Sequence, residues 1–505
     1  MLNGSVVLRL LFCLTLILNL FFAVDTQAAE KQQRPNILFA IADDWGWPHA
    51  GAYGDPVVKT PTFDRLAREG VLFQHAYVSS PSCTPSRGAI LTGKYHWQLE
   101  AGANLHCIFP DKFETYPEIL KAHGYRVGHT GKAWGPGRTE TRSRELAGKR
   151  YKNFENFMNQ RDGETPFCFW LGSSDPHRPY QAGSGVKSGM DLSKIKLPAC
   201  FPDATEVRSD VADYYWEVQR FDKLVGDALA LLEQKGELEN TIIVMTGDHG
   251  MPFPRSKSCL YDTGTRVPLA ARWPAKIPAG RSVTDFVSLI DLAPTFYEAA
   301  GVTIPADVTG RSLMPVLSNS KSGRVTAERG EIYFGKERHV PSQEAPDMGG
   351  YPCRAVRTDD FLYIHNFRPD RWPAGTPEYQ KATIPGTWYG DCDNGPTKTY
   401  MIQKKDKDDN HRRLYELAFG KLPAEELYDL RNDPDQLKNV AQDAMYQKVK
   451  TELAKKMHQH LIATHDPREL GQGDELEQHP YLGGGPKHPS LEVKRKKRGK
   501  KNQVK

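Results

Sequence analysis

The sequence predicts an α/β domain followed by a smaller α+β domain. Three apolar runs of strand length, 36–42, 167–173 and 241–246, alternate with helix-like segments in the first part of the chain. Near-continuous apolar runs of this kind are typical of parallel strands that are buried on both faces. From about Gly330, short strand-like runs follow one another closely, which predicts a small antiparallel sheet. These runs cover residues 331–334, 353–357 and 361–367.

Length and composition agree with a globular protein of more than one domain. The chain has 505 residues, of which 39% are apolar and 26% charged, and it contains 36 prolines. These values exclude a fibre or a largely disordered chain and indicate many loops. We place the α/β domain at residues 30–325, the smaller domain at 326–470, and a polar and basic tail, expected to be disordered, at 471–505.

Residues 1–29 have the pattern of a secretory signal peptide. Arg9 precedes a largely apolar run at 10–24, and the small residues of 26–29 suit cleavage. An uncleaved anchor helix is the alternative, but the run is short for a membrane span. We therefore expect export, to the periplasm or the exterior in a bacterium and to the lysosome in a eukaryote.

The formal net charge of +5 depends on the last twelve residues. Residues 494–505 hold eight lysines and arginines and no acid, so the rest of the chain is mildly acidic. Such a tail suits polyanions such as sulfated glycans, or a membrane surface, and it is equally consistent with a solvated segment that has no partner. We expect no nucleic-acid partner and no membrane contact beyond the electrostatics of this tail.

The chain contains eight cysteines, and their use limits the choice of metal site. Cys13 lies in the predicted signal peptide and Cys83 in a motif discussed below. The other six form an even number, which allows disulfides in an exported chain, although the sequence does not give their pairing. These six are Cys107, Cys168, Cys200, Cys259, Cys353 and Cys392. Because no Cys-x-x-Cys pair or His-rich tract occurs, the argument for a metal rests on carboxylates.

Periodicity predicts the elements between the apolar runs. Residues 61–69 form a helix with Phe63, Leu66 and Ala67 inward, and Gly70 ends it. The other predicted elements are a strand at 71–78, a helix at 116–122, a strand around Val127, a helix at 209–234, a strand at 286–290 and a capped helix from Asp291. The segment 426–430 and a turn at 432–434 lead to a final amphipathic helix at 445–462.

The stretch Cys83-Thr84-Pro85-Ser86-Arg87 is the strongest chemical signal. It opens a predicted helix that ends at 91–93, and Ser82 is the expected N-cap. The first turn of a helix favours an anion, and Arg87, one turn after Cys83, suits an oxyanion beside the thiol. A lone cysteine at this place is usually a buried structural residue, but the complete pattern favours chemistry.

Acidic residues follow two of the buried strands at the point where each strand ends. Asp43 and Asp44 come directly after 36–42, and Asp248 and His249 come after 241–246. The carboxyl ends of parallel strands meet at one edge of a sheet, so we expect these side chains to lie together. Oxygen ligands in this number suit calcium or magnesium. A solvated Asp-Asp turn is the alternative for the first pair.

Three further side chains lie where they suit an anionic substrate. Lys132 stands between glycines after the strand around Val127, and Lys257 follows the second acidic pair. His177 lies between prolines after the run 167–173, on a stiff loop that would hold an imidazole in one direction, as a general acid requires. Each of these residues alone is more simply explained as a surface residue. Its position after a predicted strand, like that of the acidic pairs, favours a role in the site.

The pattern Cys-x-Pro-Ser-Arg at 83–87, with Thr92-Gly93 after it, resembles the signature of the type I sulfatases. In that family the cysteine is converted to formylglycine. The resemblance extends over most of the chain, from Arg34 to about Pro467, and includes the segments around Lys132, His177, Lys257 and Leu427. It implies the alkaline-phosphatase-like fold, which is an α/β/α sandwich with a smaller C-terminal α+β domain.

The resemblance also implies a metal site and a mechanism. Asp43, Asp44, Asp248 and His249 correspond to ligands of one divalent cation, usually calcium, and the formylglycine made from Cys83 touches the same ion. Relatives often have asparagine where His249 stands. One hydroxyl of the hydrated formylglycine attacks sulfur, and the other later expels sulfate and regenerates the aldehyde.

The remaining implied roles concern charge and partners. Arg87, Lys132 and Lys257 neutralise the sulfuryl oxygens together with the metal, and His177 protonates the leaving group. The implied partners are a sulfated carbohydrate substrate and a formylglycine-generating enzyme during maturation. Many relatives have Lys-x-His after the strand, whereas this chain has Trp134 in place of the histidine. We expect Trp134 to line the sugar site instead.

Several functions remain open within this resemblance. The segments at 82–87, 250–254 and 464–467 resemble the heparan N-sulfatase branch, which acts on N-sulfoglucosamine, but an O-sulfatase of algal or host polysaccharides has the same core. A phosphoester or phosphonate hydrolase would share the fold, and a non-catalytic glycan-binding relative is the alternative of another class. The presence of Cys83 together with His177 argues against a pure binding protein.

Overall fold

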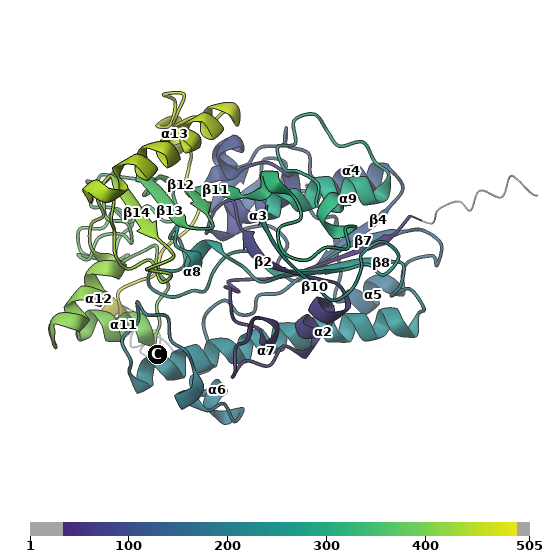
Figure 1. Ribbon diagram of the computed structural model, residues 1–505, viewed down its shortest axis with the longest axis horizontal. Helices are drawn as coiled ribbons and strands as arrows, with labels where there is room; N and C mark the ends of the chain where they lie inside the picture. The colour runs from purple at the N-terminus through teal and green to yellow at the C-terminus, as the bar shows by residue number, and fades with distance from the viewer. Residues whose placement is uncertain (1–33, 492–505) are drawn as a thin grey trace, which may run out of the picture.

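The larger domain is built on a mixed eight-stranded sheet. A computed structural model describes residues 34–491 of the chain (Figure 1). Five adjacent strands are parallel, β9 runs antiparallel to both of its neighbours, and β10 runs parallel to β2 at the edge. The strand order is β10 (Arg281–Ser288), β2 (Val71–Tyr77), β9 (Leu269–Arg272), β8 (Thr241–Gly247), β1 (Asn36–Ala42), β7 (Phe167–Gly172), β4 (Arg126–Thr130) and β6 (Lys149–Arg150).

Helices cover both faces of this sheet, so the domain is an α/β/α sandwich (Figure 1). Because side chains alternate along a strand, Leu38 and Ala40 of β1 face one helical layer, while Ile37, Phe39 and Ile41 face the other. The first layer contains α2 (Pro61–Glu69), α5 (Phe154–Met158) and α7 (Thr205–Gln234). The second contains α3 (Cys83–Thr92), α4 (Tyr116–Ala122) and α9 (Leu292–Ala300).

The smaller domain contains a four-stranded antiparallel sheet beside the α3 end of the large sheet (Figure 1). Its strands, in spatial order, are β11 (Glu331–Lys336), β12 (Cys353–Thr358), β13 (Phe361–Asn366) and β14 (Glu425–Asp429). The helix α13 (Gln447–Ala463) packs on one face through Leu453, Met457 and Leu461. Two further helices, α11 (Pro396–Gln403) and α12 (Asp409–Phe419), join the core that contains α7.

Short elements complete the described chain. A two-stranded parallel sheet pairs β3 (Cys107–Phe109) with β5 (Gly137–Thr139). The short helices are α6 (Ser184–Lys187), α8 (Asp262–Thr265), α10 (Met314–Leu317) and α14 (Glu475–Gln478). Among residues 34–491, no helix is both long enough and apolar enough to cross a bilayer.

The predicted fold class is confirmed, and most predicted elements lie within a few residues of their observed bounds. The helix at 61–69 has the predicted bounds and buries Phe63, Leu66 and Ala67. The strand expected at 286–290 instead occupies Arg281–Ser288, because polar residues such as Asp285 interrupt its apolar pattern. Asp285 is fully buried and accepts hydrogen bonds from two backbone N–H groups, so its polarity did not signal exposure. We did not predict β9.

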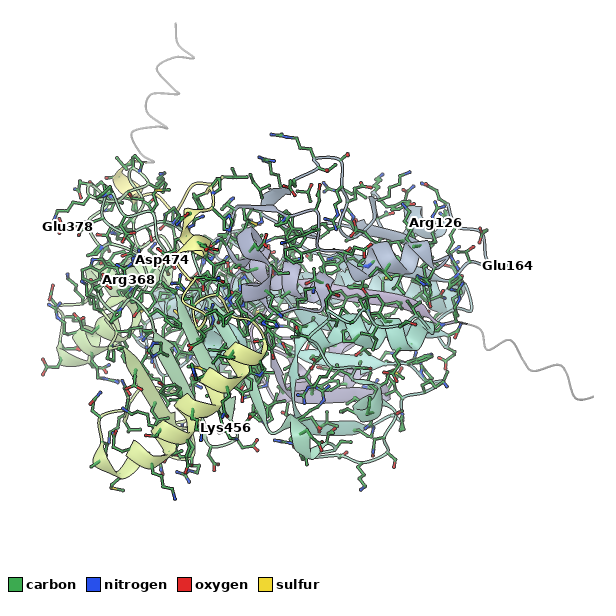
Figure 2. All side chains as sticks on the ribbon, turned by 90° about the horizontal axis from the view of Figure 1, so that it is seen from above. Arg126, Glu164, Arg368, Glu378, Lys456 and Asp474 are labelled. Carbon is green, nitrogen blue, oxygen red and sulfur yellow. The ribbon has the colours of Figure 1, made fainter. Side chains whose placement is uncertain are left out.

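Part of the predicted tail is folded. We expected residues 471–505 to be disordered, but 471–491 carry α14 and pack on the body, so that expectation is wrong for these residues. Figure 2 shows Asp474 and Arg368 toward one end of the molecule, and Arg126 and Glu164 at the other. The basic segment 494–505 and the predicted signal peptide at 1–29 lie outside the described residues.

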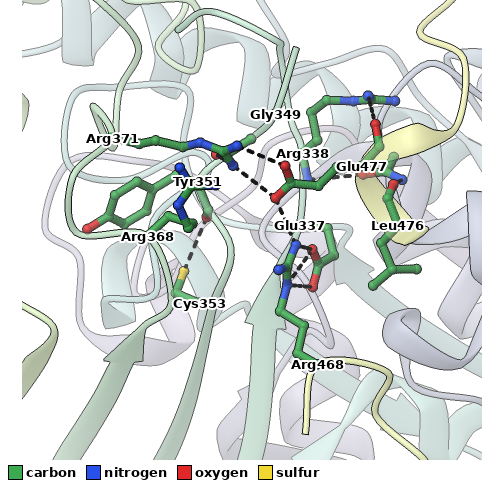
Figure 3. Close-up of polar contacts among 12 residues, drawn as sticks. Glu337, Arg338, Gly349, Tyr351, Cys353, Arg368, Arg371, Arg468, Leu476 and Glu477 are labelled. Carbon is green, nitrogen blue, oxygen red and sulfur yellow. Dashed lines mark hydrogen bonds and ion pairs between the residues drawn. The ribbon is translucent and has the colours of Figure 1, made fainter. Parts of the chain in front are cut away.

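A network of largely buried ion pairs holds α14 on the smaller domain (Figure 3). The Glu477 carboxylate accepts two hydrogen bonds of 2.9 Å from Arg371 and lies 3.0 Å from a guanidinium nitrogen of Arg468. Arg468 also pairs with Glu337, and Arg338 donates to the Glu477 carbonyl. These contacts between distant parts of the sequence replace the disorder that the local composition suggested.

The seven cysteines among the described residues are unpaired. Six of them, Cys83, Cys107, Cys168, Cys200, Cys353 and Cys392, are buried. The disulfides that an even number of cysteines allowed are therefore absent from residues 34–491, and the core forms without them.

Candidate active site

Cys83 is the first residue of α3, and its thiol lies at the carboxyl edge of the large sheet. The residue is 3% exposed, and burial raises the pKa of the thiol above its ordinary value. Its Sγ atom lies 3.2 Å from Nε2 of His249. Ser82 is the N-cap of α3, as predicted, and has extended backbone, but its hydroxyl lies 2.8 Å from Nδ1 of His339 and does not bond to the helix.

Three side chains gather beside this thiol. Asp43 and Asp44 follow β1, and His249 follows β8; one ligand atom from each of these and from Cys83 all lie within 4.8 Å of one another. Oδ1 of Asp44 is buried and has no hydrogen-bond partner among residues 34–491. Asp44 also has a φ of 72°, a left-handed backbone that is uncommon for aspartate and is found at functional sites.

The orientation of His249 fits a cation in this group. Its Nδ1 lies 3.0 Å from the carbonyl oxygen of Gly250, which only accepts, so Nδ1 carries the hydrogen. In the neutral ring, Nε2 then carries a lone pair. The distance from Nε2 to the unpartnered Oδ1 of Asp44 is 3.0 Å. Two lone pairs at this distance repel each other unless a positive charge lies between them. The donor set therefore suits a divalent cation.

Asp248 lies beside this group and is held by other contacts. Its Oδ1 accepts from the backbone N–H of Asp44 at 2.9 Å, and its Oδ2 accepts from Nε of Arg87 at 2.7 Å. The Arg87 guanidinium is fully buried and also donates to the carbonyls of Lys132 and Ala133. Arg87 thus holds the strand ends in place, where we had expected it to bind the substrate oxyanion.

Lys132 forms an ion pair with Asp43 at the same edge. Its Nζ lies 2.6 Å and 2.7 Å from the two carboxylate oxygens. Burial alone would raise the pKa of Asp43, but the charges of Lys132 and Arg87 hold it well below its ordinary value. Burial alone would lower the pKa of Lys132, and Asp43 raises it above its ordinary value. Both groups are therefore charged at neutral pH.

Lys257 bridges two carboxylates. Its Nζ lies 2.9 Å from Oδ2 of Asp44 and 2.9 Å from Oδ2 of Asp393. Burial opposes the charge on Lys257, but Asp393 and Asp44 outweigh it and raise the pKa well above its ordinary value. Burial likewise opposes the charge on Asp393, whose pKa Lys257 lowers. This pair connects the large domain to a loop that precedes α11.

His177 faces the same place from the loop after β7. Its Nδ1 lies 2.6 Å from the carbonyl oxygen of Arg178 and so donates to it, which leaves Nε2 as the atom that faces Asp44, 3.9 Å from Oδ2. Arg178 is fixed by two hydrogen bonds of 2.8 Å to Asp210 on α7. The imidazole, 34% exposed, is therefore held in one direction at the mouth of the site.

A cavity of about 910 Å³ opens over these groups. Asp43, Cys83, Lys132, His177 and Lys257 all line it, so the structure brings together five of the residues that the sequence singled out. The smaller domain and the C-terminal segment supply much of the remaining wall. Their lining residues are His339, Val340, Gly390, Asp393, Asn394 and 484–486.

Sequence reasoning missed Asp393, His339 and His106. Asp393 lies in a polar loop with the composition of an ordinary turn, and no sequence pattern marks the two histidines. Burial lowers the pKa of His339 to about 3, so this ring is neutral beside Ser82. Trp134 lines the cavity, as expected, and packs edge-on against Phe109.

Comparison with known proteins gives the family. The model of the sulfatase family matches residues 35–302, which is more than half of the chain and contains every catalytic and metal-binding candidate predicted from the sequence. The chain belongs to the sulfatase family. A second family model, that of the C-terminal part of N-sulphoglucosamine sulphohydrolase, matches residues 247–373 of this sulfatase.

Curated relatives extend over nearly the whole sulfatase chain. The N-sulphoglucosamine sulphohydrolase of Homo sapiens is 29% identical, with 86% of this chain and 91% of the relative covered. An ulvan-active sulfatase of Formosa agariphila is 27% identical, with 88% of this chain and 77% of the relative covered. Because the chain belongs to this family and is similar to these relatives, it is a sulfuric ester hydrolase.

Solved structures confirm the alkaline-phosphatase-like sulfatase fold. BT4656, solved in complex with D-glucosamine-2-N,6-O-disulfate, has a TM-score of 0.61 at 21% identity and covers 88% of this chain and 100% of its own. The phosphonate monoester hydrolase of Agrobacterium radiobacter has the same TM-score at 19% identity, with 86% and 95% covered. At these identities the likeness concerns the fold alone.

Proposed function

We propose that this sulfatase removes sulfate groups from sulfated glycans through a formylglycine made from Cys83. The observation that carries this proposal is the position of Cys83, buried at the start of α3 and grouped with Asp43, Asp44 and His249. Formylglycine, when formed, supplies the nucleophile, and a bound divalent cation, proposed to be calcium, supplies positive charge beside it. Conversion requires a formylglycine-generating enzyme as a partner.

The other side chains then have separate tasks. Lys257 is buried and Lys132 is half-buried, both are positive, and they face the cavity, where they stabilise the negative oxygens of a sulfuryl group. Arg87 holds Asp248 and the strand ends in place. The His177 ring is pinned through Nδ1, so its Nε2, when protonated, gives a proton to the leaving nitrogen or oxygen.

We propose an N-sulfated glucosamine as the first substrate to test. The similarity of residues 247–373 to the C-terminal model of N-sulphoglucosamine sulphohydrolases supports it, because this range supplies Lys257 and His339 to the cavity. O-sulfated algal glycans are the second candidate, since two of the relatives are ulvan-active sulfatases of Formosa agariphila. The apolar run at 10–24 supports export of the protein.

A substrate panel tests this proposal. Protein coexpressed with a formylglycine-generating enzyme is given N-sulfoglucosamine, O-sulfated glycosaminoglycan fragments, algal sulfated oligosaccharides and a phosphonate monoester, and released sulfate or phosphonate is measured. We expect sulfate release from N-sulfoglucosamine, its loss on chelation, and its recovery with calcium. The Cys83→Ser variant, expressed in the same way, is the matched control.

Each outcome decides between candidates. Release from O-sulfated sugars alone keeps the sulfatase mechanism and rejects the N-sulfate. If the phosphonate is turned over faster than any sulfated substrate, the protein is a phosphonate hydrolase and the proposed sulfatase function is rejected. Glycan binding without any turnover, in protein whose residue 83 is converted, leaves only the binding alternative.

A further inference from the structure

A second cavity adjoins the catalytic one and has a different chemical character. It has a volume of about 420 Å³, and it shares Lys132 and Trp134 with the catalytic cavity. Its wall is formed by the loop after β4, the strand β5 and the segment that leads to β6. No residue predicted from the sequence lies in it apart from the two that are shared.

The lining of this second cavity is strongly basic. Arg138, Arg142 and Arg150 line it, and within residues 34–491 none of the three forms an ion pair or a side-chain hydrogen bond. Arg144 also lines it, but the two acids that form ion pairs with it, Glu118 and Asp111, lie outside the lining. Glu145 is the acid in the lining.

Three unpaired arginines that line one cavity suit an anionic ligand. A guanidinium group presents a planar fork of donors that matches sulfate or carboxylate oxygens. Three such groups around one hollow repel one another, and a bound anion would offset this repulsion. Arg138 is half-buried on β5, and Arg150 lies on β6 at the sheet edge, so regular elements support two of the three.

A third cavity, which also adjoins the catalytic one, lacks an excess of basic residues. A hollow of about 740 Å³ shares Ser174 and Asp175 with the catalytic cavity. Acids exceed bases by one among its charged lining residues, with Glu155, Asp175 and Asp227 against Lys152 and Arg220. The charges therefore favour a polyanionic chain that extends from the catalytic cavity towards the arginines over one that extends into this hollow.

We propose that the arginine cavity binds a second anionic group of the substrate, a sulfate or carboxylate on the sugar next to the one that is cleaved. This proposal rests on the proposed function. Lys132 faces the sulfate at Cys83, Trp134 lines both cavities, and Arg138, Arg142 and Arg150 receive the neighbouring anion. The natural substrate is then an anionic oligosaccharide, and a sulfated monosaccharide uses only half of the site.

Two kinetic consequences follow. An oligosaccharide with a second anion has a lower KM than the matching monosaccharide, while kcat changes little, because the second anion lies away from the reacting sulfur. Salt weakens this advantage, because exposed charges are screened within about 8–10 Å at moderate ionic strength.

The test uses the full-length converted enzyme and the triple variant Arg138→Gln, Arg142→Gln, Arg150→Gln. We measure kcat and KM for a sulfated monosaccharide and for a disaccharide in which a uronate adjoins the same sugar. The variant is expected to lose about tenfold in kcat/KM for the disaccharide, through KM, and less than about twofold for the monosaccharide. The control triple Lys407→Gln, Lys448→Gln, Lys455→Gln removes three exposed positive charges from the smaller domain.

A binding measurement separates this proposal from the proposed function. Titration calorimetry of a heparin-derived tetrasaccharide into Cys83→Ala protein needs no turnover, and the same arginine changes are expected to weaken binding about tenfold. If binding and the disaccharide KM are the same in the arginine variant as in the lysine control, the subsite is rejected and the sulfatase function stands. If no substrate is turned over but the arginines still decide binding, the proposed function fails and the subsite stands.

Discussion

At the scale of single residues, Arg87 joins the parts of the site that come from different strands. Its guanidinium donates to Asp248 after β8, to Ala42 at the end of β1, and to Lys132 and Ala133 after β4. The sequence motif placed this arginine one turn after the thiol, but the motif does not say what it contacts. Its partners come from three distant segments, so only the fold reveals its positioning role.

Removing this guanidinium is expected to cost stability. Arg87→Met leaves the fully buried Asp248 carboxylate without its charged partner, which lowers the free energy of unfolding by about 3–5 kcal/mol. Urea unfolding followed by tryptophan fluorescence measures the loss. Arg142→Met is the control, because this exposed arginine has no partner among the described residues, and we expect a change within about 0.5 kcal/mol. Equal losses in the two variants would show that Arg87 has no such role.

The chain sequence predicted which residues line the site better than it predicted their contacts. Asp43, Asp44, Cys83 and His249 form a group because two strand ends and a helix start meet at one sheet edge, which is a general property of parallel sheets. Asp393 was missed because its role arises from one long-range contact with Lys257, and nothing in its own polar loop distinguishes it.

At the scale of elements, buried parallel strands were the easiest to predict. β1, β7 and β8 are mostly apolar and buried throughout, whereas β10 carries polar residues whose partners come from residues 323–326. The segment after α13 was the hardest. Its composition is polar, and it folds only because arginines of the smaller domain bind Glu477 and because its backbone bonds to His106 and Trp388.

Glu477 is expected to keep this segment on the wall of the catalytic cavity. Glu477→Gln removes the charge that pairs with Arg371 and Arg468, so residues 479–486 open more often. Hydrogen exchange read by mass spectrometry should rise about tenfold in peptides from this range, with a higher KM. Glu475→Gln changes an exposed acid of the same helix and serves as the control. Unchanged exchange in Glu477→Gln would contradict the role of the network.

At the scale of the whole molecule, both domains are needed to form the substrate cavity. The large domain supplies the thiol, the carboxylates and Lys132, while the smaller domain supplies His339 and the loop that carries Asp393. Ion pairs such as that of Lys257 with Asp393 cross between these parts. Composition and element order predicted two domains, but the way they share one cavity depends on side chains that are distant in sequence.

Buried histidines make the whole molecule sensitive to acid. Burial lowers the pKa of His49 to about 4 and that of His339 to about 3, and it holds the pKa of His96 well below its ordinary value. The unfolded chain binds protons on these rings below about pH 6.5, and the folded chain does not. Stability is therefore full above pH 6.5 and falls as the pH decreases towards the folded pKa values. Asp222, whose pKa burial raises to about 6, acts in the opposite direction.

We expect the free energy of unfolding to fall by a few kcal/mol between about pH 7 and pH 5, since each histidine contributes about 1.4 kcal/mol per pH unit below 6.5. Urea unfolding at several pH values measures this slope, and His339→Gln should reduce it. A flat profile, or the same slope in the variant, would mean that His339 is not the neutral buried group described above.

The most direct test of the account compares sulfate release with conversion of Cys83. Preparations made with different amounts of formylglycine-generating enzyme contain different fractions of converted protein, which the mass of the peptide containing residue 83 reports. The account predicts that the initial rate of sulfate release is proportional to the converted fraction and extrapolates to zero for the thiol form. Sulfate release that is independent of the fraction, or a fully converted enzyme that releases none from any sulfated glycan, would contradict it.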